Sequence, residues 1–234
     1  MDNSEHKPKL RPIGEELKRM ARSRKIGIPR FRFPISIEEA YQLIGAFYNA
    51  EVERRGYRCE FGEFTLDKIW TVAEILTSPH PRFGLIFTGQ VGNGKTTLLH
   101  AINSTAKYLA DCGHIDPTAY GYQYKSDFGM DFYNAKQLAQ IAKSDWKRFE
   151  SIMAKPMLAV DELGEEPKTV LEYGNALNPI IDLIEHRYNH QKFTVITTNL
   201  DPKEISEKYG ARIADRFREM LSIVVFGNEK SFRK

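Results

Sequence analysis

A glycine-rich segment followed by a lysine and a threonine carries the clearest chemical signal in the sequence. Gly89 and Gly94 bracket four residues, and Lys95 and Thr96 follow directly, in the pattern G-x-x-x-x-G-K-[ST]. Glycines let the backbone curl so that successive N–H groups face phosphate oxygens, and the N-terminus of the next helix adds positive potential. Lys95 supplies charge near the β- and γ-phosphates, and the Thr96 hydroxyl can hold Mg²⁺. The segment therefore predicts an Mg·ATP site with the nucleotide-binding residues Gly89, Gln90, Val91, Gly92, Asn93, Gly94, Lys95, Thr96 and Thr97.

Two adjacent carboxylates follow a short apolar run later in the chain. Asp161 and Glu162 come directly after residues 157–160, which read as a buried strand. Ligands of open α/β sheets bind at the carboxyl ends of strands, so Asp161 should lie beside the metal. Glu162 is then placed to orient or deprotonate the attacking water. The alternative is a strand followed by two solvated acids. If Asp161 and Glu162 have the roles given above, the protein hydrolyses ATP as well as binding it.

An asparagine and two arginines complete the set of candidate catalytic side chains. Asn199 follows the apolar run 193–197 and could hydrogen-bond the attacking water or the γ-phosphate, or else cap the turn before Asp201. Arg212 and Arg216 are four residues apart and share one face of a short predicted helix. In a monomer they would be surface charges, but in an assembly one could reach a neighbour's γ-phosphate as an arginine finger. The candidate catalytic residues are Glu162, Asn199, Arg216 and Arg212, and the candidate metal ligands are Thr96 and Asp161.

These side chains need a scaffold that brings several strand ends to one edge. Apolar runs alternate with helix-compatible stretches along the chain, which favours a parallel sheet covered by helices. The predicted strands cover residues 85–88, 130–133, 157–160, 193–197 and 223–226, and the longest predicted helices cover residues 95–110 and 171–189. Pro179 interrupts the second of these helices and should kink or split it.

The segment before the first predicted strand has a helical pattern. Ser36 and Glu39 have the spacing of a capping box, so a helix should begin there and run to about Arg55. A second helix should cover about residues 66–77 and end before Pro79. The apolar face of the first helix should pack on the rest of the chain or on a partner. We divide the chain into a basic, partly disordered arm (1–34), a helical N-terminal region (35–80) and an ATPase core (81–234).

Positive charge is concentrated in the predicted arm. Residues 1–34 carry ten Lys or Arg against four Asp or Glu, a net charge of +6, and the remaining 24 against 27 give −3 for residues 35–234. Such an arm can attract nucleic acid or an acidic protein surface, or it can be a solvated tail.

Composition and cysteine usage narrow the class of protein further. Apolar residues make up 41% and charged residues 28%, which is typical of a globular chain. No stretch approaches the roughly 18 apolar residues of a membrane span, and no signal-peptide pattern opens the chain, so we expect a cytoplasmic protein without membrane contact. Cys59 and Cys112 lack the spacing of a metal site or disulfide framework, and we interpret both as buried thiols.

The order of the motifs is itself informative. The glycine-rich loop, the strand ending in Asp161-Glu162, the strand ending in Thr-Thr-Asn and the segment 209–218 together resemble the DnaC/IstB group of AAA+ ATPases, over about residues 83–234. The resemblance implies an α/β P-loop NTPase fold of AAA+ type: a three-layer sandwich with a five-stranded parallel sheet of order 5-1-4-3-2, no helical lid, and a short helical N-terminal region. It implies that Lys95 and Thr96 belong to Walker A, Asp161 and Glu162 to Walker B, and Asn199 to sensor 1, with Arg216 the first choice for the finger and Arg212 the second.

The same resemblance implies a role in DNA replication. Such proteins assemble on ATP into homo-oligomers, contact single-stranded DNA and load the hexameric replicative DNA helicase, so we expect ATP and Mg²⁺ as cofactors. An IstB-like helper of DNA transposition is the alternative, and a binding module with negligible turnover is a third reading that Glu162 opposes. Two segments could track single-stranded DNA: the basic residues 18–32, and an insertion between Cys112 and Gly129 that bears Tyr120, Tyr122, Tyr124 and Lys125.

Overall fold

The computed structural model describes residues 29–58, 61–167, 170–172 and 175–227. The strands are β1 (Gly84–Thr88), β2 (Asp131–Asn134), β3 (Met157–Leu163), β4 (Val170–Glu172), β5 (Asn175–Leu177), β6 (Phe193–Thr198) and β7 (Leu221–Val225). The α-helices are α2 (Ile37–Arg54), α3 (Glu63–Thr77), α4 (Lys95–Asp111), α5 (Ala135–Ser144), α6 (Trp146–Met153), α7 (Pro179–Asn189), α8 (Pro202–Tyr209) and α9 (Ala211–Met220). Two short 3₁₀ turns, η1 (Pro117–Tyr120) and η2 (Lys125–Asp127), precede β2.

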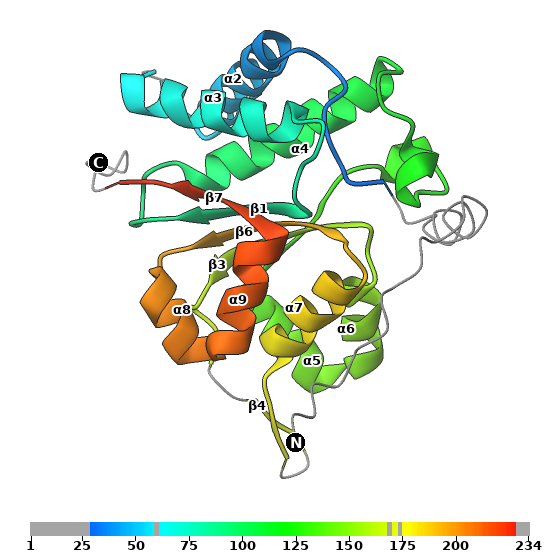
Figure 1. The fold of residues 1–234 in the computed structure, drawn as a ribbon, viewed down its shortest axis with the longest axis vertical. Helices are drawn as coiled ribbons and strands as arrows, with labels where there is room; N and C mark the ends of the chain where they lie inside the picture. Colours follow the sequence, from blue (N-terminus) through cyan, green and yellow to red (C-terminus); the bar gives the residue numbers. More distant parts are fainter. Residues whose placement is uncertain (1–28, 59–60, 168–169, 173–174, 228–234) are drawn as a thin grey trace, which may run out of the picture.

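The central sheet has five strands in the order β2-β3-β6-β1-β7, and every neighbouring pair is parallel. Numbered in chain order, these five strands have the predicted arrangement 5-1-4-3-2. Helices cover both faces: α2, α3 and α4 lie on one side and α5 to α9 on the other (Figure 1). The predicted three-layer α/β architecture is therefore confirmed. Each of the five predicted strands is present, with ends displaced by at most a few residues.

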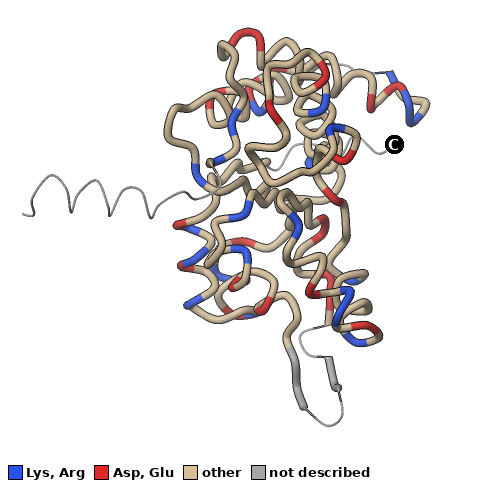
Figure 2. The backbone as a smooth tube through the Cα atoms, turned by 90° about the vertical axis from the view of Figure 1, so that its right-hand side faces the viewer, with Lys and Arg blue, Asp and Glu red and all other residues tan. Residues whose placement is uncertain are grey.

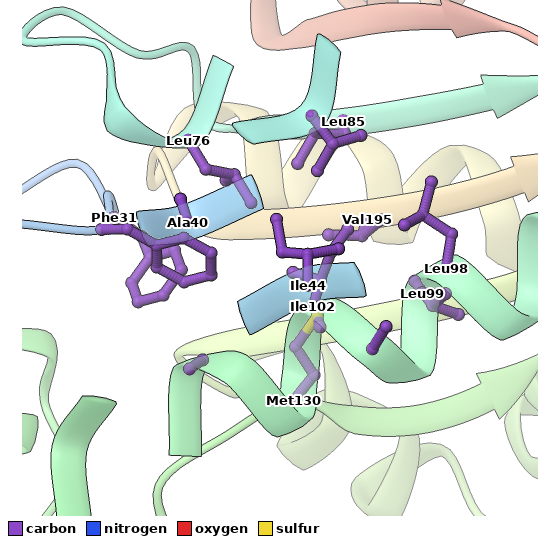
Figure 3. Close-up of a cluster of buried hydrophobic side chains, with 14 of the residues drawn as sticks. Phe31, Ala40, Ile44, Leu76, Leu85, Leu98, Leu99, Ile102, Met130 and Val195 are labelled. Atoms are coloured by element: carbon purple, nitrogen blue, oxygen red, sulfur yellow. The ribbon is translucent and has the colours of Figure 1, made fainter. Parts of the chain in front are cut away.

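Each strand contributes to two hydrophobic cores because its side chains point alternately to opposite faces. In β1, Leu85 and Phe87 enter the core beneath α2, α3 and α4, whereas Ile86 enters the core beneath the other helices. Figure 3 shows the first core, to which α2 contributes Ile44 and α4 contributes Leu98, Leu99 and Ile102. Covering on both faces is what a parallel sheet requires, and it explains why the strands read as continuous apolar runs.

The residues before α2 belong to the same core. Phe31 and Phe33 are buried, and the Phe33 amide donates to the Leu76 carbonyl at 2.7 Å. The Phe31 ring packs 4.6 Å from the Phe193 ring at the start of β6. Ser36 and Glu39 form the predicted capping box at the start of α2. The division after residue 34 stays a prediction, but the two buried rings lie on its N-terminal side; residues 1–28 of the predicted arm lie outside the described residues.

The predicted helix over residues 171–189 is wrong in its first half. Residues 170–172 and 175–177 form the antiparallel pair β4–β5, and α7 begins only at Pro179. The cause is local: the ring of Pro179 disfavours helical backbone at Asn178, while proline itself suits the first helical position. Asn178 instead caps α7, and its side chain accepts a hydrogen bond from the Ile181 amide.

The insertion before β2 is anchored to the folded body by a few buried side chains, while most of its residues are exposed. Tyr122 is buried and its hydroxyl donates to the Gly129 carbonyl, while the Tyr120 ring lies 5.3 Å from the Phe31 ring. Tyr124 is exposed, and Lys125 pairs with Asp111. Because the insertion enters β2 at its amino end, it lies at the sheet edge opposite the loop that follows β1 (Figure 1).

The predicted burial of the cysteines is wrong for Cys112. Its thiol is exposed because the residue caps the surface end of α4, where the chain turns through Gly113 at φ 80°. Cys59 lies outside the described residues. Among the helices that the structure describes, none has the length and apolar content needed to cross a bilayer.

A substitution at Phe33 tests whether the segment before α2 is part of the folded body. Phe33→Ala should lower the free energy of unfolding by about 3–5 kcal/mol, since it empties a fully buried ring site. Urea denaturation of the full chain measures this change. The control is Tyr57→Ala, because Tyr57 is 62% exposed and its removal should change stability little. Equal stabilities for the two variants would show that the segment does not contribute to the core.

Candidate nucleotide-binding site

The loop after β1 has three glycines at positive φ, a backbone conformation that favours glycine, and Gly92 at φ 89° is one of them. Gly89 has φ 142° and Gly94 has φ 89°. A Cβ on Gly89 would lie 2.1 Å from the Phe226 carbonyl oxygen, and one on Gly94 would lie 2.5 Å from the Tyr48 hydroxyl. The loop is thus closely packed between β7 and α2, and α4 begins directly after it at Lys95. This is the strand–loop–helix context that the glycine-rich motif requires.

Lys95 joins the loop to the neighbouring strand. Its Nζ donates to the carbonyls of Gly89 and Gln90, both at 2.6 Å, and to Asn93 Oδ1 at 3.2 Å. It also donates to Asn199 Oδ1 at 3.0 Å. Because β1 and β6 are adjacent, the ammonium group and the predicted sensor meet at the carboxyl edge of the sheet. The Asn199 side chain itself is exposed, so it remains accessible from outside the loop.

Asp161 is the point at which three elements meet. Thr96 at the start of α4 donates to its two carboxylate oxygens at 3.1 and 3.3 Å. Thr197 near the end of β6 donates to the same carboxylate. The predicted metal ligands Thr96 and Asp161 are therefore brought together. A hydroxyl and a carboxylate are oxygen donors of the kind Mg²⁺ prefers.

Glu162 is presented by a bulge. The register between β3 and β6 shifts between Val160 and Leu163, so that β3 carries one extra residue at the end of the strand. Glu162 has φ 55°, an unusual value for a residue other than glycine, and its amide donates to Thr197 Oγ1 at 2.9 Å. Its side chain is exposed. The bulge thus presents the second carboxylate to solvent beside the Asp161 site, which is where a water-activating group is needed.

A buried polar network fixes the loop that follows Glu162. Glu166 is only 4% exposed and accepts hydrogen bonds from the Gly164 amide at 2.8 Å and the Tyr209 hydroxyl at 2.5 Å. Lys208 pairs with the same carboxylate at 3.2 Å. Burial raises the pKa of Tyr209, so its hydroxyl stays a donor. The network ties the loop after β3 to the end of α8, immediately before the helix that carries the two arginines.

The two candidate finger arginines differ in how tightly the chain holds them. The Arg216 side chain is 11% exposed, forms an ion pair with Glu185 of α7, and lies over the Tyr188 ring at 5.1 Å. Arg212 is 77% exposed, and its Nε lies 3.6 Å from the Glu185 carboxylate. The described ion pairs of both arginines are thus with α7. Arg212 is the more accessible of the two, whereas Arg216 must leave Glu185 to reach any other group.

The last predicted nucleotide-binding residue, Thr97, contacts the N-terminal helical region. Thr97 is buried, and its hydroxyl accepts a hydrogen bond from Arg55 Nη1 at 3.1 Å. Arg55 in turn donates to Glu51, which also pairs with Arg54 at 2.8 Å. The Arg54 guanidinium holds the pKa of Glu51 down to about 2, so this carboxylate is charged at neutral pH. One wall of the site therefore comes from α2.

No motif marks Thr197, Arg55 or Glu166, which contact predicted site residues or the loop that follows Glu162. The sequence offered one signal for Thr197, namely a hydroxyl side chain at the end of a predicted apolar strand. Arg55 and Glu166 carry none, because their partners Thr97 and Tyr209 are 42 and 43 residues away in the sequence. Such contacts depend on tertiary structure and not on local pattern.

The residues present fit a nucleoside triphosphate with Mg²⁺. The loop backbone curls where a Cβ would collide, Lys95 lies within it, and paired oxygen donors lie at its end. No group of three or more His, Cys, Asp or Glu side chains in the described ranges could hold a metal ion, so the paired oxygen donors of Thr96 and Asp161 are the candidate ligands. The predicted role of each residue stays a prediction, but the geometry assembles Lys95, Thr96, Asp161, Glu162 and Asn199 at one edge of the sheet.

Comparison with known proteins shows the fold. No family model and no curated protein matches the chain. Among solved structures, the DnaC helicase loader is 22% identical, with a TM-score of 0.54, over 77% of this chain and 98% of that one. DnaI is 19% identical with a TM-score of 0.47, over 71% of this chain and 87% of that one. AMPPCP-bound DnaA from Aquifex aeolicus is 17% identical with a TM-score of 0.47, over 75% of this chain and 50% of that one. The likeness to the DnaC helicase loader confirms the predicted resemblance at the level of the fold.

Proposed function

We propose that this chain is an Mg²⁺-dependent ATPase of the AAA+ type that loads the hexameric replicative DNA helicase onto single-stranded DNA, with ATP binding and hydrolysis as the switch. The observation that carries the ATPase assignment is the convergence of Thr96 and Thr197 on Asp161, beside the Lys95–Asn199 pair. The order of the sequence motifs, and the fold shared with the DnaC helicase loader, support the loading role.

Each side chain then has a defined task. Lys95 exchanges its bonds to loop carbonyls for bonds to phosphate oxygens. Thr96 and Asp161 would hold Mg²⁺, and the ion would supply positive charge to the phosphates. Glu162 takes a proton from the attacking water or orients it. Asn199, already bonded to Lys95, hydrogen-bonds the water or the γ-phosphate.

Both candidate finger arginines, Arg212 and Arg216, pair with Glu185 of α7 in the described chain. This favours ATP-dependent association in which α9 of one copy completes the site of the next. The exposure of Arg212 supports that residue as the one that reaches the neighbour, with Arg216 orienting it through their shared partner Glu185.

Substitutions at Lys95 and Glu162 separate binding from chemistry. Lys95→Ala should abolish measurable ATP binding, because the loop loses its charge toward the phosphates. Glu162→Gln should bind ATP normally and lose about 10²–10⁴-fold in turnover, the range for a general base. Calorimetric titration and phosphate release measure the two quantities. Lys203→Ala, which removes an 84% exposed lysine, is the control for both assays. Wild-type turnover in Glu162→Gln would contradict the assignment of the base.

Mixing variants tests action across an interface. Arg212→Ala and Glu162→Gln should each be inactive alone, but an equimolar mixture should regain activity at roughly a quarter of the interfaces, since some pairs combine an intact carboxylate with an intact arginine. Arg216→Ala mixed with Glu162→Gln is the parallel experiment. Recovery only with Arg216→Ala would reverse the order of the two arginines. No recovery with either, at any ratio, would count against a finger acting in trans.

Truncation separates the two predicted macromolecular surfaces. The truncation should remove residues 1–28 and not 1–34, because Phe31 and Phe33 are core residues. Basic and acidic residues alternate along the described backbone (Figure 2), and the basic excess lies largely in the removed part. The truncated chain should lose ATP-dependent capture of the replicative helicase. It should keep most of its affinity for single-stranded DNA, measured by fluorescence anisotropy at two salt concentrations. Loss of DNA binding with retention of the helicase would mean that the surfaces are exchanged, and capture of a transposase instead would favour the transposition role.

A further inference from the structure

We propose that Arg55 is a second cationic contact for the bound nucleotide, placed by α2 to meet the α-phosphate. The inference rests on the proposed nucleotide site and adds to it a residue from outside the ATPase core. Arg55 caps the C-terminal end of α2, and its Nη1 lies 3.1 Å from the Thr97 hydroxyl in the first turn of α4. The guanidinium therefore lies beside the loop-and-helix segment whose amides receive the phosphates.

The arrangement of α4 indicates which phosphate Arg55 meets. Thr96 faces β3, where its hydroxyl contacts Asp161, while Thr97 comes about 100° further round the helix and faces α2. Lys95 and Asn199 mark the same end of the site as Asp161, which is the end for the γ-phosphate. A triphosphate held by the loop then has its γ-phosphate at the edge of the sheet. Its α-phosphate and ribose lie toward Thr97 and Arg55.

Glu51 holds the Arg55 guanidinium in position. Arg55 Nε and Nη2 donate to Glu51 Oε1 at 3.1 and 2.8 Å, which leaves Nη1 directed at α4. The Glu51 side chain is only 12% exposed and that of Arg55 is 36% exposed, so the pair is anchored at one end and accessible at the other. A guanidinium fixed in this way loses little further freedom when it binds an oxyanion.

Arg54 provides a matched control on the same helix. It pairs with the same Glu51 carboxylate at 2.8 Å, but its side chain is 68% exposed and its described bonds are with Glu51. Removing Arg54 therefore changes the net charge and the Glu51 pair as removing Arg55 does. Of these two arginines, Arg55 alone has a described hydrogen bond to α4.

Calorimetric titration of the full chain with Mg·ATP and Mg·ADP tests the inference. Arg55→Gln should lower the affinity for both nucleotides by the same factor, about 10-fold to 100-fold. This is the effect expected from losing a charge-assisted hydrogen bond to a phosphate that both nucleotides have. Arg54→Gln should leave both affinities within about twofold of wild type. A loss for ATP alone would place Arg55 at the γ-phosphate and overturn the proposal, and so would an unchanged affinity for both nucleotides.

Titration with the two diastereomers of ADPαS distinguishes phosphate binding by Arg55 from a merely structural role of that residue. They differ only in which non-bridging oxygen on the α-phosphorus is replaced by sulfur. If Arg55 binds one of these oxygens, Arg55→Gln changes the ratio of the two affinities, whereas loosened packing between α2 and α4 lowers both affinities equally and overturns the proposal. Arg55→Lys keeps the charge and serves if Arg55→Gln does not fold; it should show a smaller loss and an altered ratio. Failure of the wild-type chain to bind either nucleotide would instead refute the proposed function itself.

Discussion

The rest of the site depends on the hydrogen bonds that the Asp161 carboxylate accepts. The carboxylate accepts them from the hydroxyls of Thr96 and Thr197, and so joins the start of α4 to the ends of β3 and β6. Asp161 is half-buried, and both of its carboxylate oxygens accept hydrogen bonds from these hydroxyls. The same contacts set the position of the glycine-rich loop relative to Glu162 and Asn199. Every proposed chemical role at this edge of the sheet depends on the position of the loop relative to these two residues.

The order of the strands explains why these residues converge. Parallel strands bring their carboxyl ends to one edge, and β1, β6 and β3 are neighbours in the sheet although they are far apart in the chain. The loop after β1, Asn199 after β6 and the carboxylates at the end of β3 are therefore adjacent by topology. The bulge at the end of β3 then separates the directions of Asp161 and Glu162, and the buried Glu166 network fixes the loop beyond them. The sheet sets the positions of the site residues, and the β3 bulge and the Glu166 network set the orientation of the carboxylates and the loop.

Local pattern was sufficient for most of the framework. Apolar runs such as residues 157–160 gave the strands because both faces of the sheet are buried, and the spacing of Ser36 and Glu39 gave the start of α2. Among the predicted site residues, Lys95 contacts Asn199 and Thr96 contacts Asp161, whereas Arg212 and Arg216 pair with Glu185 of α7. Pattern failed where neighbours in space decide the outcome: the β4–β5 pair replaced a helix that Pro179 could not continue, and Cys112 lies at an exposed helix end. The ion pair that holds Arg216 against Glu185 also has no signature in the sequence.

The contacts of α2 with the loop and with α4 have a thermodynamic consequence. Tyr48 abuts Gly94, and Arg55 bonds to Thr97, so one helix supplies both a wall of the nucleotide site and part of the N-terminal surface. Linkage between two ligands is reciprocal: a macromolecule that binds this helix and displaces it must change the affinity for nucleotide by the same factor as nucleotide changes the affinity for that macromolecule. A coupling free energy of only 1–3 kcal/mol corresponds to about 5-fold to 150-fold in affinity. With such coupling, release of a partner and exchange of nucleotide would depend on the same conformational equilibrium.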